Sequence, residues 1–313
     1  MSAILPPPSE KSYNRLDRND WKGRMPMIWD RLGVLTDEVS PDLREALDWA
    51  AEHRLAHVEI RTVEGRNVID LADAALLDIR KETEKRGLFV SAVASPVFKC
   101  ALDPSRPVQT GDAFGQREER VEAHYRKLER AIEIAGLLGT KRIRIFSFWR
   151  ENDPKAYESD IVTHLKAAAA MAEKAGVTLL LENEPSCNGG YAAEVGRLAR
   201  LAASPALKVL WDPGNEAYGG KPAYPEGYGA VKDVIGHVHL KDALTDEGGV
   251  PRCVPIGQGA VPYGAQLSAL ERDGYSGLYT IETHYVPEGG TAAHGTGLTL
   301  EGLRTVLSAG RTS

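Results

Sequence analysis

The sequence has few cysteines, no long apolar run and no excess of basic residues, and each absence excludes a class of protein. Its 313 residues include three cysteines, Cys100, Cys187 and Cys253. They are odd in number and far apart, so they predict neither a disulfide framework nor a zinc knuckle. No stretch approaches the ~18 consecutive apolar residues of a membrane span. The formal net charge of −6 gives no footprint for a nucleic-acid backbone, so we expect neither a nucleic-acid nor a membrane partner.

The N-terminal segment M-S-A-I-L-P-P-P-S-E-K lacks the apolar core and the cleavage site of a signal peptide. We therefore expect a cytoplasmic protein. Residues 1–30 are Pro-rich and then polar, with Trp21 and Trp29 among them, and we interpret them as an N-terminal arm. The arm fits association into a homo-oligomer as well as packing against the rest of the chain.

Residues 31–313 alternate short apolar segments with amphipathic ones, which indicates one domain of repeated strand–helix units. Such repetition predicts an α/β fold, a (β/α)8 TIM barrel with an N-terminal extension. A doubly wound open sheet is the alternative, but no G-x-G-x-x-G follows the first strand, so a dinucleotide site is not expected. Helices separate most of the strands, and a last one is expected from about Leu298. The predicted strands are 31–35, 57–60, 89–94, 142–146, 177–182, 208–212, 237–240 and 279–282.

Four of these strands end on a side chain that can bind a divalent metal. The segments V-T-L-L-L-E, L-K-V-L-W-D, V-I-G-H-V-H and G-L-Y-T-I-E close on Glu182, Asp212, His239 and Glu282. A parallel barrel brings the carboxyl ends of its strands to one rim, where barrel enzymes carry their chemistry. The spacing therefore predicts a metal site made of two glutamates, one aspartate and one histidine.

Each of these residues also has a purely structural interpretation. Glu182 and Glu282 could each form a salt bridge with a neighbouring Arg or Lys, and Asp212 lies in D-P-G-N, a good turn sequence. His237 and His239 are two apart and so share one face of a strand, where hydrogen-bonded core histidines are the alternative to ligands. The occurrence of all of them at strand ends favours the metal site.

The ligand types limit both the metal and the reaction. Three carboxylates and one imidazole, with no thiolate, favour Mn²⁺, with Mg²⁺, Co²⁺ or Zn²⁺ as alternatives. Free coordination positions suit a hydroxy-carbonyl compound, and polarising its carbonyl makes the proton on the adjacent carbon acidic. Glu182 and Glu282 could then act as base and acid on the two faces of an enediolate. This supports isomerisation, epimerisation or β-elimination of water.

Nine short motifs accompany these strand ends. They are T-D-E-V-S (36–40), V-E-I-R-T-V-E-G-R-N-V-I-D-L (58–71), A-S-P-V-F-K-C (94–100), I-R-I-F-S (143–147), L-L-L-E-N (179–183), W-D-P-G-N (211–215), H-V-H-L-K-D (237–242), P-I-G-Q-G-A-V (255–261) and T-I-E-T-H (280–284). Together they resemble the xylose-isomerase-like TIM-barrel superfamily, in its branch of sugar phosphate isomerases and epimerases, over about residues 31–310. The resemblance implies a metal-dependent isomerase or epimerase of a sugar or sugar-like polyol. It places the metal on Glu182, Asp212, His239 and Glu282, with the two glutamates as the acid/base pair.

The resemblance also implies polar substrate contacts on the same rim. Lys241 could instead pair with Asp242, and Arg61 with Glu59. Asn183 and Glu184 follow the first ligand and are expected to orient it. The positions that match substrate contacts are Glu59, Arg61, Asn215, His237 and Lys241.

Three positions depart from the ketose 3-epimerases of this family. Asn188 stands where they carry an acidic residue, Asn215 where they carry His, and Thr245 where they carry Arg. Arg252, further along the same loop, is a candidate replacement for that arginine. The substrate therefore cannot be transferred from those enzymes, although Asn188 and Arg252 remain expected substrate contacts.

The last strand is followed by His284, which is either a second acid/base group or a cap on the loop. His284 is the last of the expected substrate contacts. The glycine-rich stretch 287–297 is expected to form a flexible lid. Two alternatives to an isomerase stay open. A lyase of the inosose or dehydroshikimate dehydratase type, or a C-glycoside-cleaving enzyme, would begin with the same proton abstraction. A non-catalytic binding barrel is the other.

Overall fold

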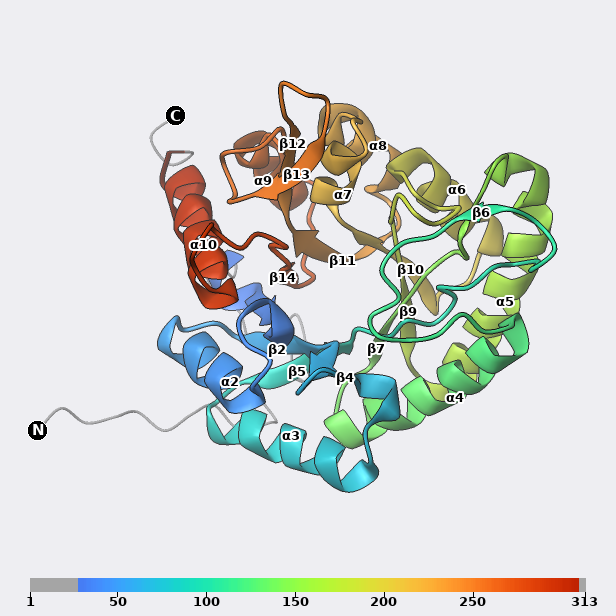
Figure 1. Cartoon of the computed structure of the whole chain (residues 1–313), viewed down its shortest axis with the longest axis horizontal. Helices are drawn as coiled ribbons and strands as arrows, with labels where there is room; N and C mark the ends of the chain where they lie inside the picture. The colour runs from blue at the N-terminus through green and yellow to red at the C-terminus, as the bar shows by residue number, and fades with distance from the viewer. Residues whose placement is uncertain (1–27, 310–313) are drawn as a thin grey trace, which may run out of the picture.

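The computed structural model describes residues 28–309, and eight parallel strands form a closed barrel with helices around it (Figure 1). Around the barrel, each strand lies beside its predecessor in the chain, and the last strand pairs with the first. The predicted (β/α)8 barrel is confirmed. The strands are β1 (Leu32–Leu35), β2 (His57–Ile60), β5 (Phe89–Val93), β7 (Arg142–Ile145), β9 (Thr178–Glu182), β10 (Leu207–Trp211), β11 (Ile235–Leu240) and β14 (Tyr279–Ile281).

Helices connect successive strands on the outside of the barrel (Figure 1). Gly139 and Gly176 end two of them in the left-handed conformation, at φ 74° and 68°, which glycine adopts without a steric cost. The helices are α2 (Leu43–Glu52), α3 (Asp73–Lys85), α4 (Val121–Leu138), α5 (Glu158–Ala175), α6 (Ala192–Ala202), α7 (Pro213–Tyr218), α8 (Tyr228–Val231), α9 (Tyr263–Arg272) and α10 (Ala292–Ala309).

Side chains alternate along each strand between the helical layer and the barrel interior. Leu179 and Leu181 of β9 pack in the main core under the helices, whereas Leu180 lies in a separate interior cluster with Ala92 and Leu210. Residues that are paired in register share a face, so the neighbours of Leu210 on the adjacent strands also point inward. These neighbours are Glu182 and His237. Alternation therefore directs the polar strand residues into the barrel.

The C-terminal helix differs from its prediction. It begins at Ala292 instead of near Leu298, so the second half of the stretch 287–297 is helical and the predicted lid is wrong there. Gly295 gives the physical reason. A Cβ at this position would collide with the carbonyl oxygen of Tyr285, so the glycine lets the first turns of α10 pack against the preceding loop. Because this close approach requires glycine, the sequence at the start of the helix resembles that of a loop.

Other segments bear on the sequence predictions. The D-P-G-N sequence forms the first turn of α7, where Asp212 is the N-cap and Pro213 occupies the first helical position. The arm predicted for residues 1–30 lies almost wholly outside the described residues, which include only the start of η1 (Ile28–Arg31). Among residues 28–309, no helix has the length and apolar character needed to cross a lipid bilayer.

Candidate active site

Glu182, Asp212, His239 and Glu282 converge at the carboxyl ends of four neighbouring strands. All four are buried, and one ligand atom of each lies within 4.8 Å of the others. His239 Nδ1 lies 3.2 Å from Glu182 Oε1 and 3.0 Å from Glu282 Oε2. Asp212 Oδ2 is buried without a hydrogen bond, although Lys241 Nζ approaches it to 2.9 Å as an ion pair. These ligand atoms, of which Asp212 Oδ2 has only the ion pair with Lys241, fit a divalent cation.

Glu59 supports this group from inside the barrel. One carboxylate oxygen accepts hydrogen bonds from His237 Nε2 at 2.6 Å and from Thr280 Oγ1 at 2.5 Å, and the other lies 3.2 Å from His239 Nε2. When Nε2 of His239 carries the proton that Glu59 accepts, the lone pair on Nδ1 faces Glu182 and Glu282. Glu59 and His237 are fully buried, so they lie behind the ligand group.

Arg61 contacts the group from the barrel mouth. Its guanidinium donates to Glu282 Oε1 at 2.9 Å, to Asp37 Oδ2 at 2.8 Å and to Glu38 Oε1 at 2.7 Å. Burial lowers the pKa of Arg61, but the three carboxylates outweigh it and raise the pKa above its usual range. Arg61 therefore stays charged, and its donors are taken up by protein carboxylates.

Arg144 of β7 and Lys241, which directly follows β11, also contact the carboxylates. Arg144 Nη1 lies 3.3 Å from Glu182 Oε2 and 3.4 Å from Glu282 Oε1, so it bridges the two glutamates. Lys241 Nζ lies 3.2 Å from Glu282 Oε2 as well as beside Asp212. The sequence reasoning missed Arg144. The available signal was a charged residue between two isoleucines on β7, because alternation places such a residue on the inner face.

Burial and charge act against each other in this group. Burial raises the pKa of Glu282, but Lys241 and His239 outweigh it and hold that pKa well below the usual range. Burial raises the pKa of Asp212, and Glu282 and Glu182 add to the increase, against the attraction of Lys241. Burial lowers the pKa of His239, but Glu59 and Glu282 raise it well above its usual value. Such opposed shifts are typical of functional sites.

Asn215 and Asn183 fix the backbone around Asp212. The side chain of Asn183 pairs with the backbone N–H and the carbonyl of Asp212, both at 2.8 Å, and Asn215 Nδ2 donates to the carbonyl of Asn183 at 2.8 Å. Asn183 therefore orients Asp212. The expectation was that it would orient the neighbouring Glu182.

Asn188 is buried in the loop between β9 and α6, and it contacts the loop that follows β7. Its Nδ2 donates to the carbonyls of Ser147 and Trp149, at 3.1 and 3.0 Å, and its Oδ1 accepts from the backbone N–H of Glu151 at 2.9 Å. All its polar atoms bond to backbone. The structure therefore gives Asn188 the surroundings of a loop support.

The hairpin of β12 (Asp242–Thr245) and β13 (Pro251–Val254) follows β11 directly and packs against α7. Arg252 is exposed on β13 and pairs in register with Leu244. Cys253 lies on the opposite face, and the charges that act on its thiol are those of Lys241 and the ligand group. Arg252 therefore points away from the site. Asp242 accepts backbone N–H groups of Ala243, Gly257, Gly259 and Val261, instead of pairing with Lys241.

His284 is exposed at the barrel mouth, in the left-handed conformation at φ 49°. Its backbone N–H donates to Glu38 Oε2 at 2.7 Å, and its Nε2 lies 3.5 Å from Glu282 Oε1. A left-handed conformation at a residue other than glycine costs energy and is common where a side chain has to be held in place. His284 therefore faces the same carboxylate as Arg61 and Arg144.

Phe114, in the loop between β5 and α4, covers the cationic side of the mouth. Its ring centre lies 5.1 Å from the guanidinium carbon of Arg61, 4.9 Å from that of Arg144 and 4.2 Å from Lys99 Nζ. Asn67 Nδ2 donates to the carbonyl of Phe114 at 3.2 Å, which fixes the loop. No sequence pattern marked Phe114, because it lies in a long segment without regular periodicity.

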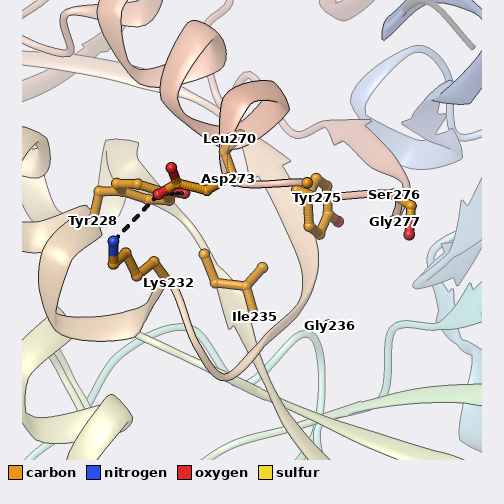
Figure 2. A pocket seen from close by; sticks show the side chains of 10 residues that line it. Tyr228, Lys232, Ile235, Gly236, Leu270, Asp273, Tyr275, Ser276 and Gly277 are labelled. Atoms are coloured by element: carbon orange, nitrogen blue, oxygen red, sulfur yellow. Dashed lines mark hydrogen bonds and ion pairs between the residues drawn. The ribbon is translucent and has the colours of Figure 1, made fainter. Parts of the chain in front are cut away.

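A cavity of about 330 Å³ lies at the opposite end of the barrel. Figure 2 shows it between the start of β11 at Gly236, the segment before β14 at Gly277, and Tyr228, where Lys232 Nζ and Asp273 Oδ2 form an ion pair at 3.4 Å. Barrel enzymes carry their chemistry at the carboxyl ends of the strands. This cavity is therefore separate from the site of the ligand group.

The fold and its buried polar side chains define a (β/α)8 barrel with its chemistry-bearing groups at the carboxyl ends of the strands. A family model, xylose isomerase-like TIM barrel, matches residues 47–306. The chain therefore belongs to the xylose isomerase-like TIM barrel family.

The individual proteins that match this chain have low sequence identity to it. The L-ribulose-5-phosphate 3-epimerase UlaE of Salmonella paratyphi C is 26% identical over 226 residues, which cover 68% of this chain and 75% of the epimerase. The crystal structure of IOLI protein with a bound zinc atom superposes with a TM-score of 0.66 at 21% identity, covering 89% of this chain and 98% of that one. The probable 3-DHS dehydratase AsbF of Bacillus anthracis superposes with a TM-score of 0.65 at 14% identity, covering 88% and 98%. At these identities the two structures are similar in fold.

Proposed function

We propose that this protein is a divalent-metal-dependent isomerase or epimerase of a sugar or sugar-like polyol. The observation that carries the proposal is the convergence of Glu182, Asp212, His239 and Glu282, with ligand atoms within 4.8 Å of one another. The sequence relative named as a ketose-phosphate 3-epimerase agrees with this reaction class. We propose Mn²⁺ as the cation, because three carboxylates and one imidazole are ligands that it prefers. The barrel of residues 31–313 would then be the catalytic domain, with residues 1–30 as an arm.

The roles of the side chains follow from their contacts. When bound, the cation supplies polarisation of a substrate carbonyl, which acidifies the adjacent carbon. Glu182 and Glu282 would each hold or release the proton at that carbon on one face of the enediolate. Arg144 touches both glutamates, so its positive charge can stabilise the anion that forms between them. Lys241 lies on the other side of Glu282 and would bind a substrate oxygen.

The proposal predicts that Glu182→Gln and Glu282→Gln each lower kcat by about 10²–10⁴-fold in the Mn²⁺-loaded protein, the range for loss of a general acid or base. The assay follows exchange of the carbon-bound hydrogen of ketoses with deuterated water by NMR, together with the epimeric products. Glu129→Gln, on the exposed face of α4, is the matched control and should keep full activity. Normal turnover in either active-site variant would contradict the two-glutamate scheme.

A dehydratase is the second candidate, and His284 is the observation that favours it. Elimination of water needs an acid for the departing hydroxyl, and the exposed imidazole lies at the mouth, 3.5 Å from Glu282 Oε1. Mass spectrometry of the product separates the two reactions. A product lighter by one water would favour the lyase, and a product of unchanged mass would favour the isomerase or epimerase.

A further inference from the structure

We propose that the active site takes an uncharged sugar or polyol and rejects the corresponding phosphate ester. This inference rests on the function proposed above and names the substrate class of the same site. Among the described residues, every cation that faces the mouth is paired with a carboxylate, and the inference is based on this pairing.

The charges around the ligand group leave no positive excess for a phosphate. With the histidines counted as neutral, seven carboxylates surround the site against four cations, which leaves three negative charges uncompensated. One divalent cation cancels two of these charges, and the site keeps one negative charge. The carboxylates are Asp37, Glu38, Glu59, Glu182, Glu184, Asp212 and Glu282, and the cations are Arg61, Lys99, Arg144 and Lys241.

Each of these cations already has a carboxylate partner, although Arg144 Nε makes no hydrogen bond. The guanidinium of Arg61 is shared among three carboxylates. Lys99 is buried, donates to the carbonyl of Asp112 at 2.8 Å, and lies 4.2 and 4.4 Å from the ring centres of Phe114 and Phe146. A phosphate dianion would have to break such pairs, whereas a hydroxyl needs only one acceptor or one donor.

Two further arginines near the mouth are paired in the same way. Arg150 donates to both carboxylate oxygens of Glu194, at 2.9 and 2.7 Å. Arg106 donates twice to Glu151 Oε1, at 3.0 and 2.7 Å. Arg252 is exposed but lies on the face of β13 that turns away from the ligand group.

The groups that reach solvent at the mouth suit hydroxyl groups and C–H faces. Glu184 is one quarter exposed, lies 3.7 Å from Lys99 and accepts the Ser186 hydroxyl at 3.0 Å. A substrate hydroxyl can donate to the lone pairs that remain on its carboxylate. The partly exposed ring of Phe114 offers an apolar surface beside it, and sugars present C–H groups to such rings. The same carboxylate would repel a phosphate placed at this end of the substrate.

The test compares free ketopentoses and ketohexoses with their terminal phosphate esters on the Mn²⁺-loaded protein. We expect kcat/KM to be at least about 100-fold higher for the best free sugar than for its ester, as when a site leaves a charge unmatched. Equal or better use of the ester would overturn the inference and leave the proposed isomerase standing. No turnover of any compound would instead count against the proposed function.

Binding is measured separately, so that the two proposals can fail independently. Free sugars at millimolar concentration should raise the melting temperature of the Mn²⁺-loaded protein, and their esters and inorganic phosphate should not. Stabilisation of the protein by the esters would overturn the inference whatever the activity shows. A failure of every free sugar in the panel to stabilise the protein would overturn it as well.

Two variants test which residues make the site discriminate between the free sugar and its phosphate ester. Glu184→Gln removes the rim carboxylate and should narrow the preference for the free sugar by about tenfold, whereas Glu129→Gln should leave the ratio unchanged. Arg252→Ala tests the exposed arginine of the hairpin. A selective loss of ester binding in Arg252→Ala would reveal a phosphate contact and overturn the inference.

Discussion

At the scale of single residues, His239 depends on the carboxylate behind it. Glu59 contacts one ring nitrogen, and Glu182 and Glu282 contact the other. A carboxylate in this position fixes the tautomer, the ring orientation and the basicity of a ligating histidine. Glu59 is therefore a positioning residue whose effect should be visible in metal binding without any substrate.

Replacing Glu59 by glutamine keeps the shape of the side chain and removes its charge. We expect Glu59→Gln to weaken Mn²⁺ binding by about 10–100-fold, the usual effect of losing such a partner, as measured by isothermal titration calorimetry. Glu151→Gln is the control, because Glu151 is also buried but pairs with Arg106 away from the ligand group. Unchanged affinity in Glu59→Gln would contradict the positioning role.

The residues of the site differ in how far the sequence reveals them. Glu182, Asp212, His239 and Glu282 could be predicted because each ends an apolar run, and parallel strands end at one rim. The partners of Glu59 could not be predicted, since they lie on strands about 180 and 220 residues further along the chain. Phe114 could not be predicted either, because loop conformation decides where its ring lies.

At the scale of elements, the short helix α7 and the start of α6 meet at one buried carboxyl group. Glu216 of α7 accepts the backbone N–H of Ala192, the first residue of α6, at 2.8 Å. Burial raises the pKa of Glu216 to about 7, with a smaller increase from Glu194 against the lowering effect of the Ala192 hydrogen bond. At neutral pH this contact is therefore near its titration midpoint.

The pKa of Glu216 gives stability a definite pH dependence. Because the folded-state pKa of Glu216, about 7, lies above its ordinary value of 4.5, the folded protein binds more protons than the unfolded chain between these two pH values. Stability should therefore fall as the pH rises through this window, by up to about 3 kcal/mol at 1.36 kcal/mol per pKa unit. Glu216→Gln keeps an acceptor for Ala192 but cannot ionise.

Urea unfolding at pH 5 and pH 8 tests this expectation. Glu216→Gln should be more stable than the natural chain by about 1–3 kcal/mol at pH 8 and nearly equal to it at pH 5. Glu129→Gln should differ little from the natural chain at either pH. An equal effect of Glu216→Gln at both pH values would show that this carboxyl does not titrate in the window.

Elements whose sequences follow a simple rule agree with their predictions, and the others do not. Strand β2 occupies the predicted range 57–60, since the alternation of apolar with polar residues defines it. Helix α10 begins six residues before its predicted start. Its first turns contain glycines that are required by contact with the preceding loop, and a single sequence does not show that contact.

At the scale of the whole molecule, the barrel interior is closed at the end away from the ligand group by a glycine and a histidine. Gly33 of β1 pairs in register with His57 of β2. A Cβ on Gly33 would collide with the imidazole and the carbonyl oxygen of His57. The absence of a side chain at this position is therefore what lets a polar ring fill the barrel.

The close contact between Gly33 and His57 predicts that one methyl group added at position 33 lowers the stability of the protein strongly. Gly33→Ala should destabilise the protein by about 1–3 kcal/mol or more, because the clash involves backbone as well as side chain. Gly136→Ala on helix α4 is the control with the opposite expected sign, because a Cβ there meets nothing within 4 Å. This substitution should stabilise the protein by about 0.5–1 kcal/mol. Urea unfolding measures both, and a neutral Gly33→Ala would contradict the packing described.

The pairing of β1 with β14 has a consequence for the synthesis of this protein. The strands that close the barrel are the first and the last, with Leu32 beside Tyr279, and the ligand group is complete only with Glu282. At about 5–20 residues per second, a ribosome needs on the order of tens of seconds to add the residues between them. During that interval the nascent chain carries Arg61 and Arg144 before Glu282, the partner that they share, has been made. A cation in the cell could therefore be captured at the complete site only after translation has passed the last strand.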